Sequence, residues 1–228
     1  GIVGVIMTWF GLRKYHERNI PLIEEDSMSL GQSVVETFKS RSFRYFLAIT
    51  FFVGGVALNN GSIFIYYVDY VFDLSGFKAV IPSAVGGVAL AIMLPIMKKI
   101  SDKIGNRNTF LIFVFLDAIA YMGLYFAKTF FMITFWFSIT SIATSCFWLL
   151  LAPMVADICD EDELKTGSRR EGMFFGINAL VSKFSPSIVI YFFMLIIESY
   201  GFVANQQQTP RAIEGIRLAV GIMPFVFI

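Results

Sequence analysis

The stretch MFFGINALVSKFSPSIVIYFFMLII, residues 173–197, limits the kinds of fold that this chain can adopt. It is long and apolar enough to cross a bilayer as a helix, yet it carries Lys183 near its middle. A lysine at the bilayer centre costs roughly 2.5–3.5 kcal/mol on insertion scales, and intramembrane charges by default mark ion or substrate pathways. The alternative is snorkelling to the nearer interface. Because Lys183 lies about 12 residues, or roughly 18 Å of helix, beyond Glu171, we favour a functional lysine.

The composition of the whole chain points to a membrane protein. Of its 228 residues, 57% are hydrophobic and only 15% are charged, whereas soluble domains carry about 25% charged residues. The net charge of +1 argues against a nucleic-acid partner. Cys146, Cys159 and the single histidine, His16, fit neither a disulfide framework nor a metal site. We therefore expect an integral, multi-pass protein of the lipid bilayer, in the cell membrane, with no metal and no cofactor.

Long apolar segments predict an all-α membrane protein. Five are long enough to span a bilayer, and they cover residues 45–72, 79–97, 109–127, 130–156 and 172–197. We interpret residues 1–12 as the end of a preceding transmembrane helix, and residues 45–228 as a six-helix bundle truncated in its last helix. A short protein with re-entrant ends is the alternative.

Basic residues alternate between successive loops. Loops 13–44, 98–108 and 157–171 contain six, four and three Lys or Arg residues, and each loop on the other side contains one. This pattern places the three basic loops in the cytoplasm. Within residues 13–44, Leu30, Val34 and Phe38 form one apolar face of a short amphipathic helix, with Ser29 as a candidate cap.

A cytoplasmic linker ahead of six helices is typical of transporters of the major facilitator type, which are built from two repeated halves. The loop MKKISDKIGNRNTF, residues 97–110, supports this interpretation. Its Asp102, Gly105 and Arg107 form a D-K-x-G-N-R pattern that resembles the D-R-x-G-R-R loop signature of that superfamily. We expect Gly105 to make a tight turn, Asp102 to approach a helix N-terminus and Arg107 to hold a neighbouring helix end. The alternative is an ordinary basic loop.

The block MVADICDEDELKTGSRREGMFFGINALVSK, residues 154–183, carries the most specific resemblance. It is similar to the glycoside-pentoside-hexuronide:cation symporters, the melibiose-permease-like family of the major facilitator superfamily. The resemblance covers the chain as a C-terminal half. It implies the six-helix half of a twelve-helix fold, alternating access, and a sugar carried with Na⁺, Li⁺ or H⁺. It also implies a missing N-terminal six-helix half that holds most of the site for the coupling cation.

Charged residues of this block predict a cytoplasmic gate. Asp157, Asp160 and Glu163 crowd the end of one helix, where negative charge opposes the helix dipole. Arg169 and Arg170 follow after a glycine turn and supply the cations that these acids need. Such a network can form and break between conformations, and matching charges of the resembled family act as such a gate. The alternative is a solvated loop with weak surface pairs.

Polar residues inside the spans are candidates for substrate binding and coupling. Trp148 follows a run of Ser and Thr residues, and the resemblance places it at a cavity-lining tryptophan that would stack on a sugar; an interfacial belt tryptophan is the alternative. Asn59 and Asn60 interrupt a span, so at least one faces the bundle interior. Asn178 precedes Lys183 on the same helix.

The leading hypothesis is therefore a cation-coupled sugar or glycoside symporter. Two alternatives remain: the same fold carrying a lysophospholipid-like solute, and a non-transporting membrane receptor. The sequence contains no Walker motif, catalytic triad or GxSxG pattern, so we predict no enzyme activity. Asp117, alone in mid-span, has no assigned role, and it is the one obvious carboxylate of this chain that could pair with Lys183.

Overall fold

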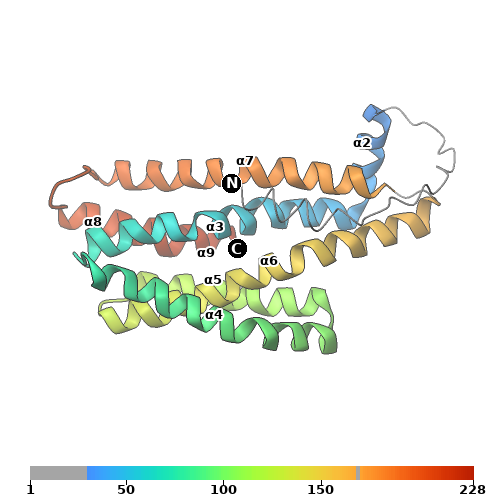
Figure 1. The fold of residues 1–228 in the computed structure, drawn as a ribbon. Coiled ribbons are helices and arrows are strands. Elements are labelled where there is room, and N and C mark those ends of the chain that lie inside the picture. Colours follow the sequence, from blue (N-terminus) through green and yellow to red (C-terminus); the bar gives the residue numbers. More distant parts are fainter. Residues whose placement is uncertain (1–29, 168–169) are drawn as a thin grey trace, which may run out of the picture.

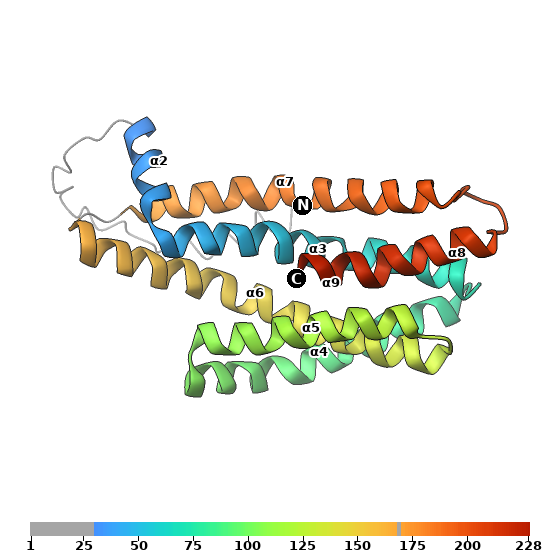
Figure 2. The same ribbon diagram turned by 180° about the vertical axis from the view of Figure 1, so that it is seen from behind.

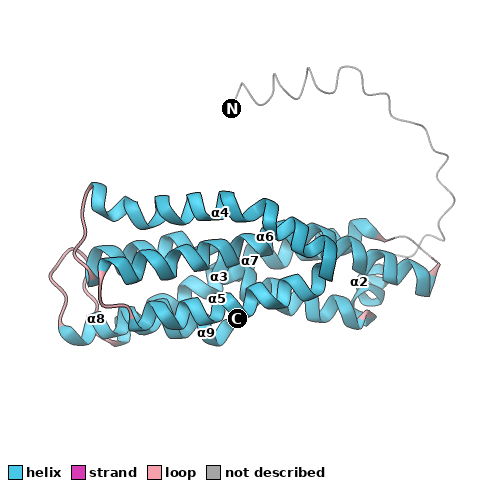
Figure 3. Ribbon diagram, turned by 90° about the horizontal axis from the view of Figure 1, so that it is seen from below, coloured by secondary structure: helices cyan, strands magenta, loops and turns pink. Residues whose placement is uncertain are grey.

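The computed structural model describes residues 30–167 and 170–228, apart from the side chain of Leu30, and the regular structure of these residues is entirely helical (Figure 3). The helices are α2 (Leu30–Lys39), α3 (Arg41–Val71), α4 (Phe77–Ile104), α5 (Asn106–Phe126), α6 (Phe130–Thr166), α7 (Glu171–Ser199), α8 (Pro210–Arg217), the π-helix η1 (Leu218–Ile222) and α9 (Met223–Phe227). The last three follow one another without a break. The apolar stretch of residues 1–12 and the candidate cap Ser29 lie outside the described residues.

Helices α3 to α7 are the five described helices that are long and apolar enough to cross a membrane. This confirms the all-α membrane class and the order of the five spans. The helices form two groups (Figures 1 and 2): α3 packs on α7 with the α8–α9 rod beside them, while α4 and α5 pack on α6. Contacts of α5 with η1 and α9 join the groups. At the α2 end, the last turns of α6 also join α3 and α7 in one apolar cluster.

Helices α3 and α7 approach each other closely at Gly55. A Cβ atom on Gly55 would lie 2.3 Å from Ser185 Oγ and 2.6 Å from Val189 Cγ2. The Ser185 hydroxyl donates to the Phe51 carbonyl of α3. Asn59 Nδ2 donates to the Pro186 carbonyl of α7 at 2.9 Å and to the Gly55 carbonyl at 3.0 Å. Small side chains and interhelical hydrogen bonds are the usual means of helix association in membranes.

This interface determines which face of α7 is buried. The side chains of α7 that are buried fall on one stripe, at spacings of four and seven residues, as expected for one helix face. They are Phe174, Asn178, Ser185, Val189, Phe193 and Ile197. The opposite face of α7 is exposed on this chain.

The connections that we expect on the cytoplasmic side are shorter than the sequence predicts. Helix α4 continues to Ile104 and α5 begins at Asn106, so the loop expected at 98–108 is the single residue Gly105, whose φ of 87° favours glycine. Helix α6 likewise continues to Thr166, so most of the expected loop 157–171 is helical. Charged residues are good helix formers and pair at i,i+4, as Lys98 and Asp102 do, so hydropathy underestimates helix length here.

The short helix expected in the linker is present as α2, but its packed side differs from the predicted apolar face. Thr37 is fully buried and bonds to the Ser33 carbonyl at 2.7 Å, whereas Val34 and Phe38 are exposed. Phe38 contacts Phe43 edge-on, with ring centroids 6.3 Å apart. Helix α3 then begins at Arg41, inside the range predicted for the linker. Helix α2 packs on the α3–α7 pair, and this contact determines which side of α2 is buried.

The contact at Gly55 generates a stability prediction. Gly55→Ala forces Ser185 and Val189 to move, and overpacking of this kind costs about 1–3 kcal/mol. Gly61, on the same helix, has no heavy atom within 4 Å of the added Cβ, so Gly61→Ala gains up to about 1 kcal/mol of helix propensity. Thermal unfolding of the purified protein in detergent measures both. Equal melting temperatures for the two variants would contradict the close α3–α7 contact.

Candidate functional site in the exposed face of helix α7

Lys183 lies near the middle of α7, on the face opposite the stripe that packs on α3. Its side chain is exposed, and within residues 30–167 and 170–228 it has no hydrogen bond or ion pair. Its neighbours on this face, one turn apart, are small and exposed: Gly172, Gly176, Ala179 and Ser187. The chain therefore presents one ammonium group on a face of small side chains, in a helix that is otherwise apolar.

The structure does not pair Lys183 with Asp117. Asp117 belongs to α5 and is 4% exposed, and its Oδ2 lies 3.4 Å from the hydroxyl of Thr144 on α6. The sequence could not separate these two groups, because hydropathy gives the depth of a side chain but not the rotation of its helix. A counter-charge for Lys183 is absent from the described part of the chain.

Asn178 and Asn60 are not brought together with Lys183 either. Asn178 is on the packed stripe of α7 and is 7% exposed, and its carbonyl accepts a hydrogen bond from Ser182 at 2.9 Å. Asn60 accepts a hydrogen bond from the Tyr121 hydroxyl of α5 at 3.2 Å. Of the two adjacent amides in α3, Asn59 is the buried one, and it holds α7.

Trp148 points away from the core of the bundle. It is 52% exposed and contacts the buried ring of Phe147 edge-on at 5.5 Å. The hydroxyl groups that precede it do not form a polar wall beside it. Thr140, Thr144 and Ser145 are buried against the neighbouring helices. These hydroxyl groups of α6 are thus packing groups. Trp148, one turn beyond Thr144 on the same side of the helix, is exposed.

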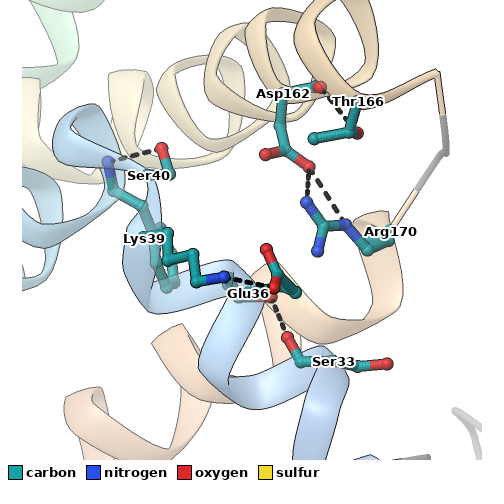
Figure 4. Close-up of polar contacts among 9 residues, drawn as sticks. Ser33, Glu36, Lys39, Ser40, Asp162, Thr166 and Arg170 are labelled. Carbon is teal, nitrogen blue, oxygen red and sulfur yellow. Dashed lines mark hydrogen bonds and ion pairs between the residues drawn. The ribbon is translucent and has the colours of Figure 1, made fainter. Parts of the chain in front are cut away.

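The end of α6 beside α2 carries a buried ion pair (Figure 4). Arg170 donates to Asp162 Oδ2 from two nitrogens, at 2.6 and 3.1 Å, and the two side chains are 9% and 8% exposed. The pair joins the end of α6 to the start of α7, across a turn in which Gly167 has a φ of 73°. Asp162 was not among the predicted gate residues. Its spacing from Val155 and Cys159 places Asp162 on the same face of α6 as these two buried residues, and this spacing could have indicated that Asp162 is buried too.

The other predicted gate residues are distributed differently. Asp157 accepts a hydrogen bond from Asn106 at the start of α5, at 3.1 Å. Asp160 is exposed, and the carbonyl of Glu163 accepts the N–H of Gly167 where α6 ends. Arg169 lies outside the described residues. Two of the predicted gate residues thus have described side-chain partners on other helices: Arg170 contacts Asp162 of α6, and Asp157 contacts Asn106 of α5.

The tight turn expected at Gly105 is present, but Asp102 does not have the contact that the loop signature predicts. Gly105 makes the tight turn between α4 and α5, and its N–H bonds to the Ser101 carbonyl at 2.9 Å. Asp102 pairs with Lys98 of its own helix at 2.7 Å instead of approaching a helix N-terminus. Arg107 lines a half-open groove of about 720 Å³ between α3, α5 and α6, together with Arg41 and Asp157.

A metal site is not evident in the part of the chain that the structure describes. It contains no group of three His, Cys, Asp or Glu side chains that could hold a metal ion. Cys146 and Cys159 are both buried and not linked by a disulfide.

Comparison with known proteins identifies the family. Residues 1–228 match the family described as MFS/sugar transport protein, so the chain belongs to it, and with its five apolar helices it is a multi-pass membrane protein. A glucuronide carrier protein homolog of Escherichia coli is 25% identical over 99% of the chain and 50% of that protein. The uncharacterized symporter YnaJ of Bacillus subtilis is 24% identical over 98% and 49%. An isoprimeverose transporter of Lactiplantibacillus pentosus is 27% identical over 69% and 34%. The chain spans about half the length of the first two of these relatives.

The buried ion pair generates a second prediction. Arg170→Met leaves the Asp162 carboxylate buried without its partner, and losing one member of a buried pair costs about 3–5 kcal/mol. Lys165→Met removes only the exposed pair with Glu161, a kind worth about 0–1 kcal/mol. The melting temperature of the purified protein should therefore fall much further in Arg170→Met. A fall of the same size in both variants would show that the Asp162–Arg170 pair is solvated.

Proposed function

We propose that this chain forms the C-terminal six-helix half of a secondary transporter, which carries a sugar or glycoside together with Na⁺ or H⁺ by alternating access. Membership of the sugar transport family supports this proposal. So do its relatives, which include a glucuronide carrier homolog, a symporter and an isoprimeverose transporter. The proposed mechanism rests mainly on the exposure of Lys183 in mid-span, because an ammonium group there is costly against lipid.

The exposed face of α7 then faces either a water-filled cavity or carboxylates of the N-terminal half. In this proposal it faces the carboxylates of the coupling-cation site. An ammonium group beside such a site repels a bound cation and stabilises the ionised carboxylates when the cation leaves. The position of Lys183 and the occupancy of the cation site are thus coupled, as a symporter requires.

Trp148 is our candidate for the wall of the sugar-binding cavity. An indole ring that leaves the bundle core, with about half of its surface exposed, has a free face for the apolar side of a sugar ring. Asn60 and Asn178 take part in packing contacts in this conformation, so Lys183 and Trp148 remain the leading residues for coupling and substrate binding.

The cytoplasmic charges are proposed to close the transporter on that side. The buried Asp162–Arg170 pair fixes the start of α7. In this proposal Asp157, Asp160, Glu163 and Arg169 form the changing part of the gate. Asp157 and Asp160 are exposed, and exposed charges can exchange partners at little cost.

Uptake into proteoliposomes tests the proposed function. The purified protein is reconstituted, and a labelled glucuronide and a labelled pentose-containing disaccharide are offered with an inward Na⁺ gradient, an inward proton gradient or none. We expect gradient-dependent accumulation of one of these sugars. Uptake of labelled lysophospholipid alone would support a lipid carrier, and binding without uptake or counterflow would support a receptor; either result would contradict the proposal.

The proposed coupling role of Lys183 is tested by substitution. Lys183→Ala should insert normally but lose cation-driven accumulation, by roughly 5–150-fold if the coupling energy is about 1–3 kcal/mol. Lys183→Arg should rescue poorly, because the planar guanidinium differs in shape from a compact ammonium. Lys128→Ala, at an exposed loop position, is the matched control. Wild-type accumulation and cation dependence in Lys183→Ala would mean that this lysine snorkels.

The role of Trp148 predicts a graded series. Trp148→Ala should weaken sugar binding about tenfold, which corresponds to about 1.4 kcal/mol, whereas Trp148→Phe keeps an aromatic face and should weaken it less. Phe135, also exposed on α6, provides the control Phe135→Ala. Isothermal titration with the transported sugar measures the affinities. Wild-type affinity in both Trp148 variants would show that the ring contacts lipid.

A further inference from the structure

Asp117 is a buried carboxyl group that the proposed transport mechanism does not use. It lies near the midpoint of α5 and is 4% exposed. Its Oδ2 lies 3.4 Å from the Thr144 hydroxyl, and its Oδ1 is buried without a hydrogen-bond partner among the described residues. A carboxyl group at this depth is sealed from both membrane surfaces by about half the length of the helix.

No cationic group among the described residues balances a negative charge on Asp117. Helix α5 packs against α4, α6, η1 and α9. The middle of α6 contributes one titratable group, the buried Cys146 thiol, and η1 and α9 contribute none. The titratable residues of α4 are confined to its two ends, and those of α5 itself are Arg107 at its start and two tyrosines beyond Asp117. In order along the chain these are Lys78, Lys98, Lys99, Asp102, Lys103, Arg107, Tyr121 and Tyr125.

Hydroxyl groups surround the carboxyl group instead of charges. The Thr144 hydroxyl of α6 lies 3.4 Å from Asp117 Oδ2. Tyr121, one turn further along α5, donates to Asn60 of α3 at 3.2 Å. The cluster therefore joins three helices. Each hydroxyl can accept a hydrogen bond as well as donate one, so the cluster offers acceptors to a protonated acid.

The side of the cluster towards the last helix is closed and dry. The crevice between Asn60, Tyr121, Val220 and Pro224 has no room for a water molecule. The π-helix η1 lies against it, and a Cβ atom on Gly221 would be 3.0 Å from the Tyr121 carbonyl and 2.5 Å from Tyr125 Cβ. Water cannot solvate an ionised Asp117 from this side.

We propose that Asp117, together with Thr144 and Tyr121, is a proton-binding site inside this helix bundle. An ionised carboxylate without water or a cation is strongly disfavoured in such surroundings. Taking up one proton converts Asp117 into a neutral acid, whose O–H can donate to the neighbouring hydroxyls. The site is separate from the coupling-cation site assigned to the other half, and it does not depend on which solute is carried.

Infrared spectroscopy of the purified protein in lipid vesicles at neutral pH tests the site. A protonated carboxylic acid has its own carbonyl stretching band, distinct from those of a carboxylate. We expect this band in the wild type, its loss in Asp117→Asn, which keeps the size of the neutral acid, and its retention in Asp69→Asn, at an exposed position of α3. An unchanged acid band in Asp117→Asn, or a wild type without one, would overturn the proposal.

A second measurement covers the case in which Asp117→Asn does not fold. Thr144→Val removes the hydroxyl that contacts the acid but keeps the shape of the side chain, so the acid band should shift in frequency. Ser138→Ala, which removes a hydroxyl bonded to its own helix, should leave the band in place. A band that is absent, or that is identical in wild type and Thr144→Val, would overturn the site. Neither readout requires transport, so failure here is distinguishable from failure of the proposed function.

Discussion

The close contact between α3 and α7 is the constraint on which the rest of the structure depends. Gly55 lets the two helices meet at Ser185, and Asn59 holds the carbonyl of Pro186 across the interface. These contacts fix the rotation of α7 about its axis. Because the packed stripe lies against α3, Lys183 must lie on the opposite face. The same small and polar residues thus determine both the stability of the helix pair and the direction in which its one mid-span charge is presented.

The start of α7 connects this helix to the remainder of the bundle. The buried Asp162–Arg170 pair holds the first turn of α7 to the end of α6, beside α2. Since α6 packs on α4 and α5 over much of its length, this pair links α7 to the second group of helices.

The spans, the turn at Gly105 and the importance of Arg170 could be predicted, because each depends on local sequence: apolar length, a glycine between two helices, and an arginine after an acidic run. The residues with which these side chains interact could not be predicted. Asp162 pairs with Arg170 because it continues a buried stripe of α6. The separation of Asn178 from Lys183, in contrast, follows from their spacing of five residues along one helix. Thr140, Thr144 and Ser145, which precede Trp148, are buried against the neighbouring helices. Such facts depend on helix rotation, which composition and hydropathy do not contain.

The most direct test of this account is the reactivity of single cysteines along α7 with a water-soluble thiol reagent. The protein is reconstituted in lipid, with Cys146 and Cys159 replaced. If the face that carries Lys183 lines the transport pathway, cysteines at Gly176, Ala179 and Ser187 react, and cysteines at Phe174, Ser185 and Val189 on the packed stripe do not. Reaction on both faces alike, or on neither, would contradict the claim that α7 presents Lys183 to an aqueous pathway.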